Sequence, residues 1–203
     1  MKEINIILPN QLFKTPSLKK ENKTYLIEEY LFFRQYNFHK QKIHFHRATM
    51  KNYEKHLSSI GFRVSYIDAF DNNADIRTFI ETQVDEKCTL HCYHPEDNWL
   101  QKRIEESCVK KGIKLVRVDN PLFLANQEEL NVFFKKEKKK FFQTSFYKTQ
   151  RQKFNLLLNE DGKPEGGKWT YDDQNREKYP KDRIPPAIPV SYTHLRAHET
   201  NQD

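Results

Sequence analysis

The feature of this sequence that most constrains its fold is an alternation of short apolar runs with amphipathic stretches between residues 4 and 119. Runs such as INIILP (4–9) and CTLHCYH (88–94) have the length of buried strands. The stretch KIHFHRATMKNYEKHLSSIG (42–61) instead has apolar residues near helical spacing. Strands that alternate with helices in this way favour a parallel sheet covered on both faces.

The pattern predicts five strands and three helices in this part of the chain. We expect the strands at 4–9, 24–30, 62–68, 88–94 and 113–119, and the helices at 42–61, 74–84 and 98–112. Gly61 and Gly112 end two of these helices as stop signals. The predicted fold class is therefore α/β: a Rossmann-like, doubly wound, mainly parallel five-stranded sheet with helices on both faces, followed by an extended C-terminal linker.

A ligand site is expected where the first two strands end. Ligands of doubly wound sheets bind beyond the carboxyl ends of the strands, at the point where the strand order reverses. Amide side chains there can both donate and accept hydrogen bonds, a carboxylate can accept them, and apolar side chains can form the walls. The predicted binding residues are Pro9, Asn10, Gln11, Leu12, Glu28, Ile43 and His46.

Several functions are disfavoured by what the sequence lacks. There is no G-x-G-x-x-G after a strand and no G-x-x-x-x-G-K-[ST], so a dinucleotide gripped in the ordinary Rossmann way is not expected. On a strand, Cys88 and Cys92 lie roughly 13 Å apart, too far for one zinc ion. We predict no metal site and no catalytic constellation.

The apolar runs, the N-terminus and the cysteines indicate the cellular compartment that we expect for the protein. No apolar run approaches the ~18 residues of a membrane span, and the N-terminus does not resemble a signal peptide. Three cysteines, an odd number, suit a reducing compartment better than a disulfide framework. We expect a cytoplasmic monomer that has no contact with a membrane.

The net charge of +7 is concentrated in residues 135–153, where eight Lys and Arg stand against one acid, Glu137. Such a cluster most often forms a solvated surface. Basic groups interleaved with aromatic rings also suit nucleic acid, so a basic, aromatic-rich nucleic-acid-binding module is an alternative function. The aromatic residues in question are Phe133, Phe134, Phe141, Phe142, Phe146 and Tyr147.

The segment 146–176 carries the most specific motif of the chain, FYKTQRQKFNLLLNEDGKPEGGKWTYDDQNR. It resembles the deoxyribodipyrimidine photolyase-related family of prokaryotic iron–sulfur photolyases and cryptochromes. PNQL (9–12) and KQKIHFHRATMKNYEKHLSSIGFRVSY (40–66) also look like family segments. The motif positions that match are Phe146, Tyr147, Lys148, Arg151, Leu156, Leu157, Gly162, Pro164, Gly166, Gly167, Lys168, Trp169, Tyr171, Asp172, Asn175 and Arg176.

The resemblance implies a division of labour between two halves of a longer protein. In the family, an N-terminal α/β domain holds a light-harvesting antenna chromophore, commonly a ribityl lumazine. A C-terminal helical domain holds FAD and a four-cysteine iron–sulfur cluster and binds damaged DNA. We expect this chain to be the antenna domain of a photolyase- or cryptochrome-like flavoprotein of DNA repair or signalling. The FAD site, the iron–sulfur cluster and the contacts with DNA would belong to the missing half. The α/β domain would dock against that half. The fragment alone is therefore predicted to be inactive.

The family motif is interpreted as a structural clasp. Gly166 and Gly167 allow a tight reversal, and the ring of Trp169 anchors the segment. Asp172, Asn175 and Arg176 have the chemistry to hydrogen-bond the backbone of a long loop. No catalytic role is assigned to any of the six.

The chain is therefore divided into three predicted parts. Residues 1–145 form the antenna-type domain, and residues 146–189 form a linker and clasp that leads towards the helical FAD domain. Residues 190–203 are predicted to be a sequencing artefact, because Val190 to Thr200 can be encoded by the transposase adaptor of short-read libraries.

Overall fold

The computed structural model describes residues 2–171 and 177–187. The chain forms two compact units, which divide between Val132 and Phe133. The boundary predicted after residue 145 falls inside the second unit, within helix α6 (Gln143–Lys153). The rings of Phe133 and Phe134 pack on Phe146, with centroids 5.0 Å apart in each pair, and so belong with α6.

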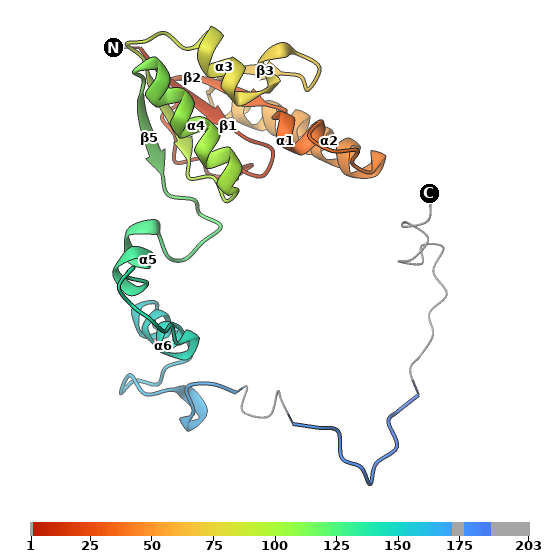
Figure 1. Cartoon of the computed structure of the whole chain (residues 1–203), viewed down its shortest axis with the longest axis vertical. Helices are drawn as coiled ribbons and strands as arrows, with labels where there is room; N and C mark the ends of the chain where they lie inside the picture. The colour runs from red at the N-terminus through yellow and green to blue at the C-terminus, as the bar shows by residue number, and fades with distance from the viewer. Residues whose placement is uncertain (1, 172–176, 188–203) are drawn as a thin grey trace. The chain divides into compact units, whose positions relative to one another are not determined.

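The first unit is built on a parallel sheet (Figure 1). Its strands are β1 (Glu3–Ile7), β2 (Lys23–Ile27), β3 (Arg63–Ile67), β4 (Thr89–Tyr93) and β5 (Lys114–Val118). They lie in the order β3-β2-β1-β4-β5, and every neighbouring pair runs parallel. The predicted α/β, Rossmann-like sheet of five strands is confirmed.

The helices of the described residues connect these strands and continue beyond them. In the first unit they are α1 (Tyr30–Phe33), α2 (Lys40–Ser59), a 3-10 turn at Asn72–Ala74, α3 (Ile76–Gln83), α4 (Asn98–Lys111) and most of α5 (Gln127–Phe133). The second unit contains α6 and a 3-10 turn at Glu165–Gly167. Within the described ranges, none of the helices is long and apolar enough to cross a bilayer.

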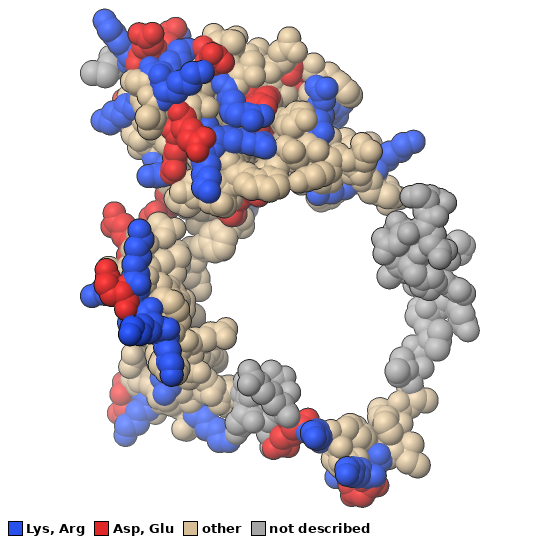
Figure 2. All heavy atoms as spheres, viewed as in Figure 1, with Lys and Arg blue, Asp and Glu red and all other residues tan. Residues whose placement is uncertain are grey.

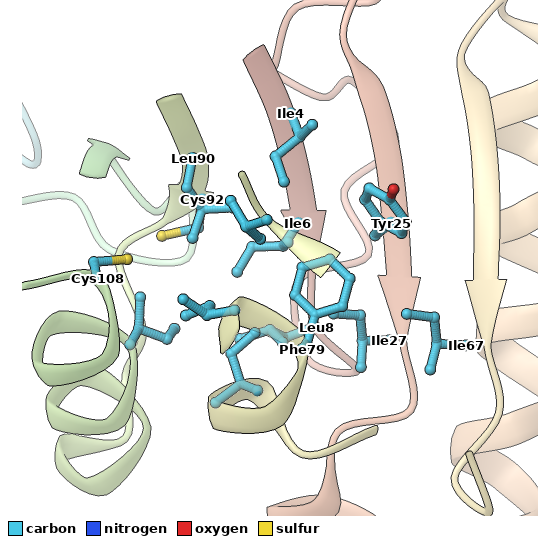
Figure 3. Packing of buried hydrophobic residues seen from close by; sticks show 14 of the residues in the cluster. Ile4, Ile6, Leu8, Tyr25, Ile27, Ile67, Phe79, Leu90, Cys92 and Cys108 are labelled. Carbon is cyan, nitrogen blue, oxygen red and sulfur yellow. The ribbon is translucent and has the colours of Figure 1, made fainter. Parts of the chain in front are cut away.

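One face of the sheet packs against α3 and α4. Because side chains alternate along a strand, Ile4, Ile6 and Leu8 project to the same face, where they meet Phe79 and Ile104 from the two helices. Figure 3 shows this packing, with the ring of Phe79 facing the strands. Burial of these apolar surfaces fixes α3 and α4 on the sheet.

The opposite face packs against α2. Ile7 and Leu26 point to this side and contact Met50, Tyr53 and Leu57 of the helix in a second buried cluster. Tyr53 also donates from its hydroxyl to the carbonyl of Phe13, at 2.8 Å. This bond holds the loop after β1 against the helix. With α3 and α4 on one face and α2 on the other, both sides of the sheet are covered, as predicted.

Helix boundaries follow from local chemistry. Asp75 and Asp97 are the N-caps of α3 and α4, and each side chain accepts a hydrogen bond from a backbone N–H of the first turn. Gly112 ends α4 with a φ of 67°, a left-handed conformation that glycine adopts readily. These signals explain why the ends of α4 agree closely with the prediction from the sequence.

The strand order places the switch point of the sheet between β1 and β4. The chain moves outward from β1 through β2 to β3, and then returns to the other side of β1 to form β4 and β5. Residues that follow β1 and β4 therefore flank the crevice in which doubly wound proteins hold ligands. Residues that follow β2 lie one strand away from it.

Candidate functional site at the carboxyl edge of the sheet

The predicted binding residue Glu28, directly after β2, has a fully buried carboxylate. Arg47 of α2 donates from Nε to Glu28 Oε1 at 2.8 Å and from Nη2 to Oε2. The Tyr66 hydroxyl donates to Oε1, and the Ala69 N–H donates to Oε2 at 2.8 Å. Four donors from α2, β3 and the β3–α3 loop thus saturate the carboxylate and tie these elements to the end of β2.

The charges around Glu28 stabilise one another. The hydrogen bond to Glu28 raises the pKa of Arg47, and Asp68 lies 3.1 Å from Arg47 Nη2 as a second acid. Burial and the hydrogen bond to Glu28 raise the pKa of Tyr66. Tyr66 therefore stays neutral and donates its hydroxyl hydrogen. Glu28 and Arg47 form an ion pair in which the carboxylate is buried and the guanidinium is partly exposed.

The predicted apolar residues of the site lie along the second buried cluster. Leu12 and Ile43 pack at its border with Phe32, and Pro9 is buried in the turn that follows β1. His46 lies between two rings, with centroid distances of 6.2 Å to Phe32 and 6.0 Å to Phe33. This arrangement makes an apolar, aromatic wall between α1 and α2.

The protonation state of His46 suits such a wall. Burial, with the nearby charge of Lys42 as a smaller cause, lowers the pKa of His46. The imidazole is therefore uncharged at neutral pH. It presents a ring face and a neutral polar edge.

Asn10 and Gln11 follow β1 at the switch point. Asn10 donates from Nδ2 to Glu96 Oε2, while Asn120 donates from its own Nδ2 to Glu96 Oε1. The loops after β1, β4 and β5 are joined in this way through one carboxylate. Asn120 also donates to the carbonyl of His94, at 3.2 Å, which holds the end of β4 against the end of β5.

Two amide atoms at this place are buried and have no hydrogen-bond partner among the described residues: Asn10 Oδ1 and Gln11 Nε2. Gln11 as a whole has no exposed surface, and its Oε1 accepts only a long bond of 3.4 Å from the N–H of Leu8. A buried polar group without a partner costs on the order of 1–3 kcal/mol. Groups of this kind in a native fold call for a ligand or water as the partner.

A hollow of about 520 Å³ opens beside this cluster, beyond β4 and β5. Its walls are mixed: Glu96, Asn120 and Gln101 are polar, and Phe123 and Leu124 are apolar. None of the seven predicted binding residues lines the hollow. Glu96, which does line it, accepts the hydrogen bond from Asn10 and so connects the hollow with the end of β1. Sequence reasoning missed Glu96 and Asn120, although both follow predicted strands, the same signal that had selected Asn10.

The family motif is held together by Arg151, whose side chain is 2 % exposed. Its guanidinium donates to three backbone carbonyls: Leu156 at 3.1 Å, Trp169 at 2.8 Å and Leu157. The same group stacks on the ring of Trp169, 5.4 Å from its centroid. Arg151 is thus the centre of the segment, a role that the sequence did not reveal because its partners are main-chain atoms.

The predicted clasp residues are placed in part. Gly166 and Gly167 have φ angles of 72° and 73° and form the reversal, and Trp169 contacts Arg151 and Lys148. At Gly166 a β-carbon would lie 2.9 Å from the hydroxyl of Tyr171, which donates to the carbonyl of Glu165. Asp172, Asn175 and Arg176 lie outside the described residues.

The three cysteines are buried in the cluster that packs α3 and α4 on the sheet. Burial raises the pKa of Cys92 to about 12 and that of Cys108 to about 11. Among the described residues there is no group of three or more His, Cys, Asp or Glu that could hold a metal ion.

The strand order and the parallel pairing define the first unit as a Rossmann-like α/β fold. Residues 5–199 match the family described as deoxyribodipyrimidine photo-lyase-related protein, and the chain belongs to this family. The match extends into the segment 190–203, for which an adaptor origin stays a prediction.

Two relatives support the assignment. An uncharacterized protein of Acanthamoeba polyphaga mimivirus is 31% identical over 191 residues, which cover 89% of this chain and 96% of that protein. A (6-4) photolyase of Agrobacterium fabrum is 27% identical over 202 residues, which cover 94% of this chain but 39% of the photolyase. The chain therefore spans well under half of the photolyase and nearly all of the viral protein.

Proposed function

We propose that the chain is the chromophore-binding α/β part of a photolyase- or cryptochrome-like protein, and that its ligand is an antenna pigment of the ribityl lumazine type. The observation that carries the proposal is the pair of buried, unpartnered amide atoms of Asn10 and Gln11 at the switch point. In a chain of this family, such atoms match the donors and acceptors of a lumazine ring.

The chemistry of the carboxyl edge fits the two ends of such a ligand. A lumazine ring carries carbonyl acceptors and a ring N–H, which complement Gln11 Nε2 and Asn10 Oδ1. Leu12 and Ile43 supply the apolar wall on the α2 side, and His46 adds its ring beside Phe32 and Phe33. The polyhydroxyl chain suits the polar lining of the hollow, where Glu96 and Asn120 are already oriented by each other.

Glu28 takes a supporting part in this proposal. Its two oxygens already accept four hydrogen bonds from the protein. We infer that it positions α2, and with it Ile43 and His46, against the end of β2. A ligand bond to Glu28 would require one of these donors to leave.

FAD and an iron–sulfur cluster are placed outside this chain in the proposal. The sequence has three cysteines, one fewer than a four-cysteine cluster requires, and all three are buried. Repair or signalling photochemistry, DNA lesion binding and a cytoplasmic location are proposed for a longer photolyase-like protein, not for these residues alone.

A titration tests the proposal. The full chain is mixed with a ribityl lumazine and binding is followed by fluorescence polarisation. Saturable binding is expected, and Asn10→Ala combined with Gln11→Ala should weaken it at least tenfold, since two buried hydrogen bonds are lost. Gln83→Ala, an exposed amide at the end of α3, is the matched control and should leave the affinity unchanged. Absence of saturable binding would refute the assignment.

A further inference from the structure

The second unit contains a loop of concentrated positive charge, residues 135–140, which we call the lysine loop. It holds Lys135, Lys136, Lys138, Lys139 and Lys140 around a single acid, and all six residues are exposed. Figure 2 shows Lys and Arg atoms in this part of the chain on the face towards the viewer.

The lysine loop is closed at its base by aromatic rings. Phe134, just before it, and Phe141, just after it, have ring centroids 5.5 Å apart. Both neighbours of the loop join Phe133 and Phe146 in one aromatic cluster, and Lys138 donates to the carbonyl of Phe133 at 2.9 Å. The five ammonium groups are thus held on one small, pinned loop instead of being spread along an extended strand.

The charge of the loop is not balanced by acids of the described chain. Among the described residues, no ion pair involves Lys135, Lys136, Lys139 or Lys140. Five ammonium groups within six successive residues repel one another. A polyanion that replaced their counterions would relieve this repulsion.

Exposed aromatic rings continue the surface directly after the loop. The side chains of Phe141, Phe142 and Tyr147 are 53%, 65% and 39% exposed. The buried guanidinium of Arg151 lies 5.6 Å from the Tyr147 ring centroid and supports that ring from within. Contact of such rings with water is unfavourable. A flat apolar partner that covered them would therefore gain binding free energy.

We propose that the lysine loop with Phe141, Phe142 and Tyr147 binds single-stranded nucleic acid. The ammonium groups would contact successive phosphates, and bases would stack on the exposed rings. A single strand is the partner that presents both chemistries at once, because its base faces are free. In a duplex they are stacked inside, and the three rings would have no role.

The surface lies in the second unit and does not rest on chromophore binding at the carboxyl edge of the first. Failure of one proposal therefore leaves the other standing.

The test measures binding of the full chain to a fluorescein-labelled 16-nucleotide oligothymidine by anisotropy at several salt concentrations. Affinity should fall steeply with salt, with a slope of about 0.7 in log–log units for each phosphate contacted. Changing Lys135, Lys136, Lys139 and Lys140 to Gln should reduce this slope by about 3. The same change at four exposed lysines of the first unit, Lys55, Lys87, Lys102 and Lys114, is the charge-matched control and should leave the slope nearly unchanged.

The aromatic part of the proposal is tested separately. Phe142→Ala should weaken oligothymidine binding by about 5- to 150-fold at fixed salt, the loss of one stacked base, whereas Phe142→Tyr should retain most of the affinity. Equal or tighter binding of a 16-base-pair duplex, together with no effect of Phe142→Ala, would overturn the assignment to a single strand. So would equal slopes in the two lysine variants. Thermal melting of each variant checks that it is folded.

Discussion

Arg47 holds the buried carboxylate of Glu28 through two parallel N–H donors, one from Nε at 2.8 Å and one from Nη2. Such a bidentate pair fixes both orientation and distance. Since Glu28 follows β2 and Arg47 belongs to α2, the pair sets where α2 lies against the sheet, and with it the wall formed by Ile43 and His46.

We expect Arg47→Met to destabilise the fold by about 3–5 kcal/mol, because the carboxylate of Glu28 would be left buried without its cation. Urea unfolding measures the loss. Lys110→Met is the control: Lys110 pairs with Glu81 at 3.8 Å on the surface, and its loss should cost less than about 1 kcal/mol. Equal losses of unfolding free energy in the two variants would show that the buried Glu28–Arg47 pair stabilises the fold no more than a surface ion pair does.

Stability should depend on the ionisation of Glu29. This buried side chain accepts from the N–H of Leu31 at 2.6 Å and of Ile76 at 3.4 Å, and burial raises its pKa to about 7. The unfolded chain releases this proton near pH 4.5, whereas the folded chain keeps it to about pH 7. Stability is therefore expected to fall between these pH values, by up to roughly 3 kcal/mol, and then to level off.

The variant Glu29→Gln isolates this effect. It cannot ionise, so its stability relative to the natural chain should rise from pH 5 to pH 8, while all other titrating groups cancel in the difference. Chemical unfolding at four pH values measures it. A difference that stays constant with pH would contradict the raised pKa.

The native thiols should resist modification. Burial raises the pKa of all three thiols: that of Cys92 to about 12, that of Cys108 to about 11, and that of Cys88 above its ordinary value. At pH 7.5 the reactive thiolate form of Cys108 is therefore at least about 100-fold less populated than that of a free thiol. An aromatic disulfide reagent should label none of them quickly in the folded chain and all three in guanidinium. Val109→Cys, at a position 81% exposed, provides a fast-reacting reference. Rapid labelling of Cys92 would contradict its burial.

Two adjacent glycines allow a sharp test of the segment around Arg151. Alanine at either Gly166 or Gly167 must adopt a φ near 72°, which costs about 1 kcal/mol. At Gly166 the added β-carbon also meets Tyr171, whereas nothing lies within 4 Å at Gly167. Gly166→Ala should therefore increase hydrogen exchange and proteolysis across residues 155–171 more than Gly167→Ala does. The reverse order would refute this geometry.

The elements of the sheet could be predicted because each carries a local signal. The expected helix at 98–112 is α4 (Asn98–Lys111), with its aspartate cap and its terminal glycine. The strand expected at 24–30 ends earlier, at Ile27, because Glu28 and Glu29 turn inward to hold α2 and the start of α3. Periodicity alone does not detect such a change of role.

The site could be predicted only in outline. Asn10 was found because it follows a strand, but its partner Glu96 lies 86 residues away. The strand order that brings β4 beside β1 is set by the packing of the whole sheet. For the same reason the sequence placed the binding residues after β1 and β2, while the order reverses between β1 and β4.

The position of β1 at the centre of the sheet also has a consequence for biosynthesis. Ile6 of β1 pairs with Tyr25 on one side and with Cys92 on the other. At 5–20 residues per second, the ribosome needs roughly 4 to 17 s to reach β4 after β1 is made. During this interval one edge of β1 has no neighbouring strand. Until β4 is made, that edge therefore leaves unpaired backbone N–H and C=O groups with which another polypeptide could pair.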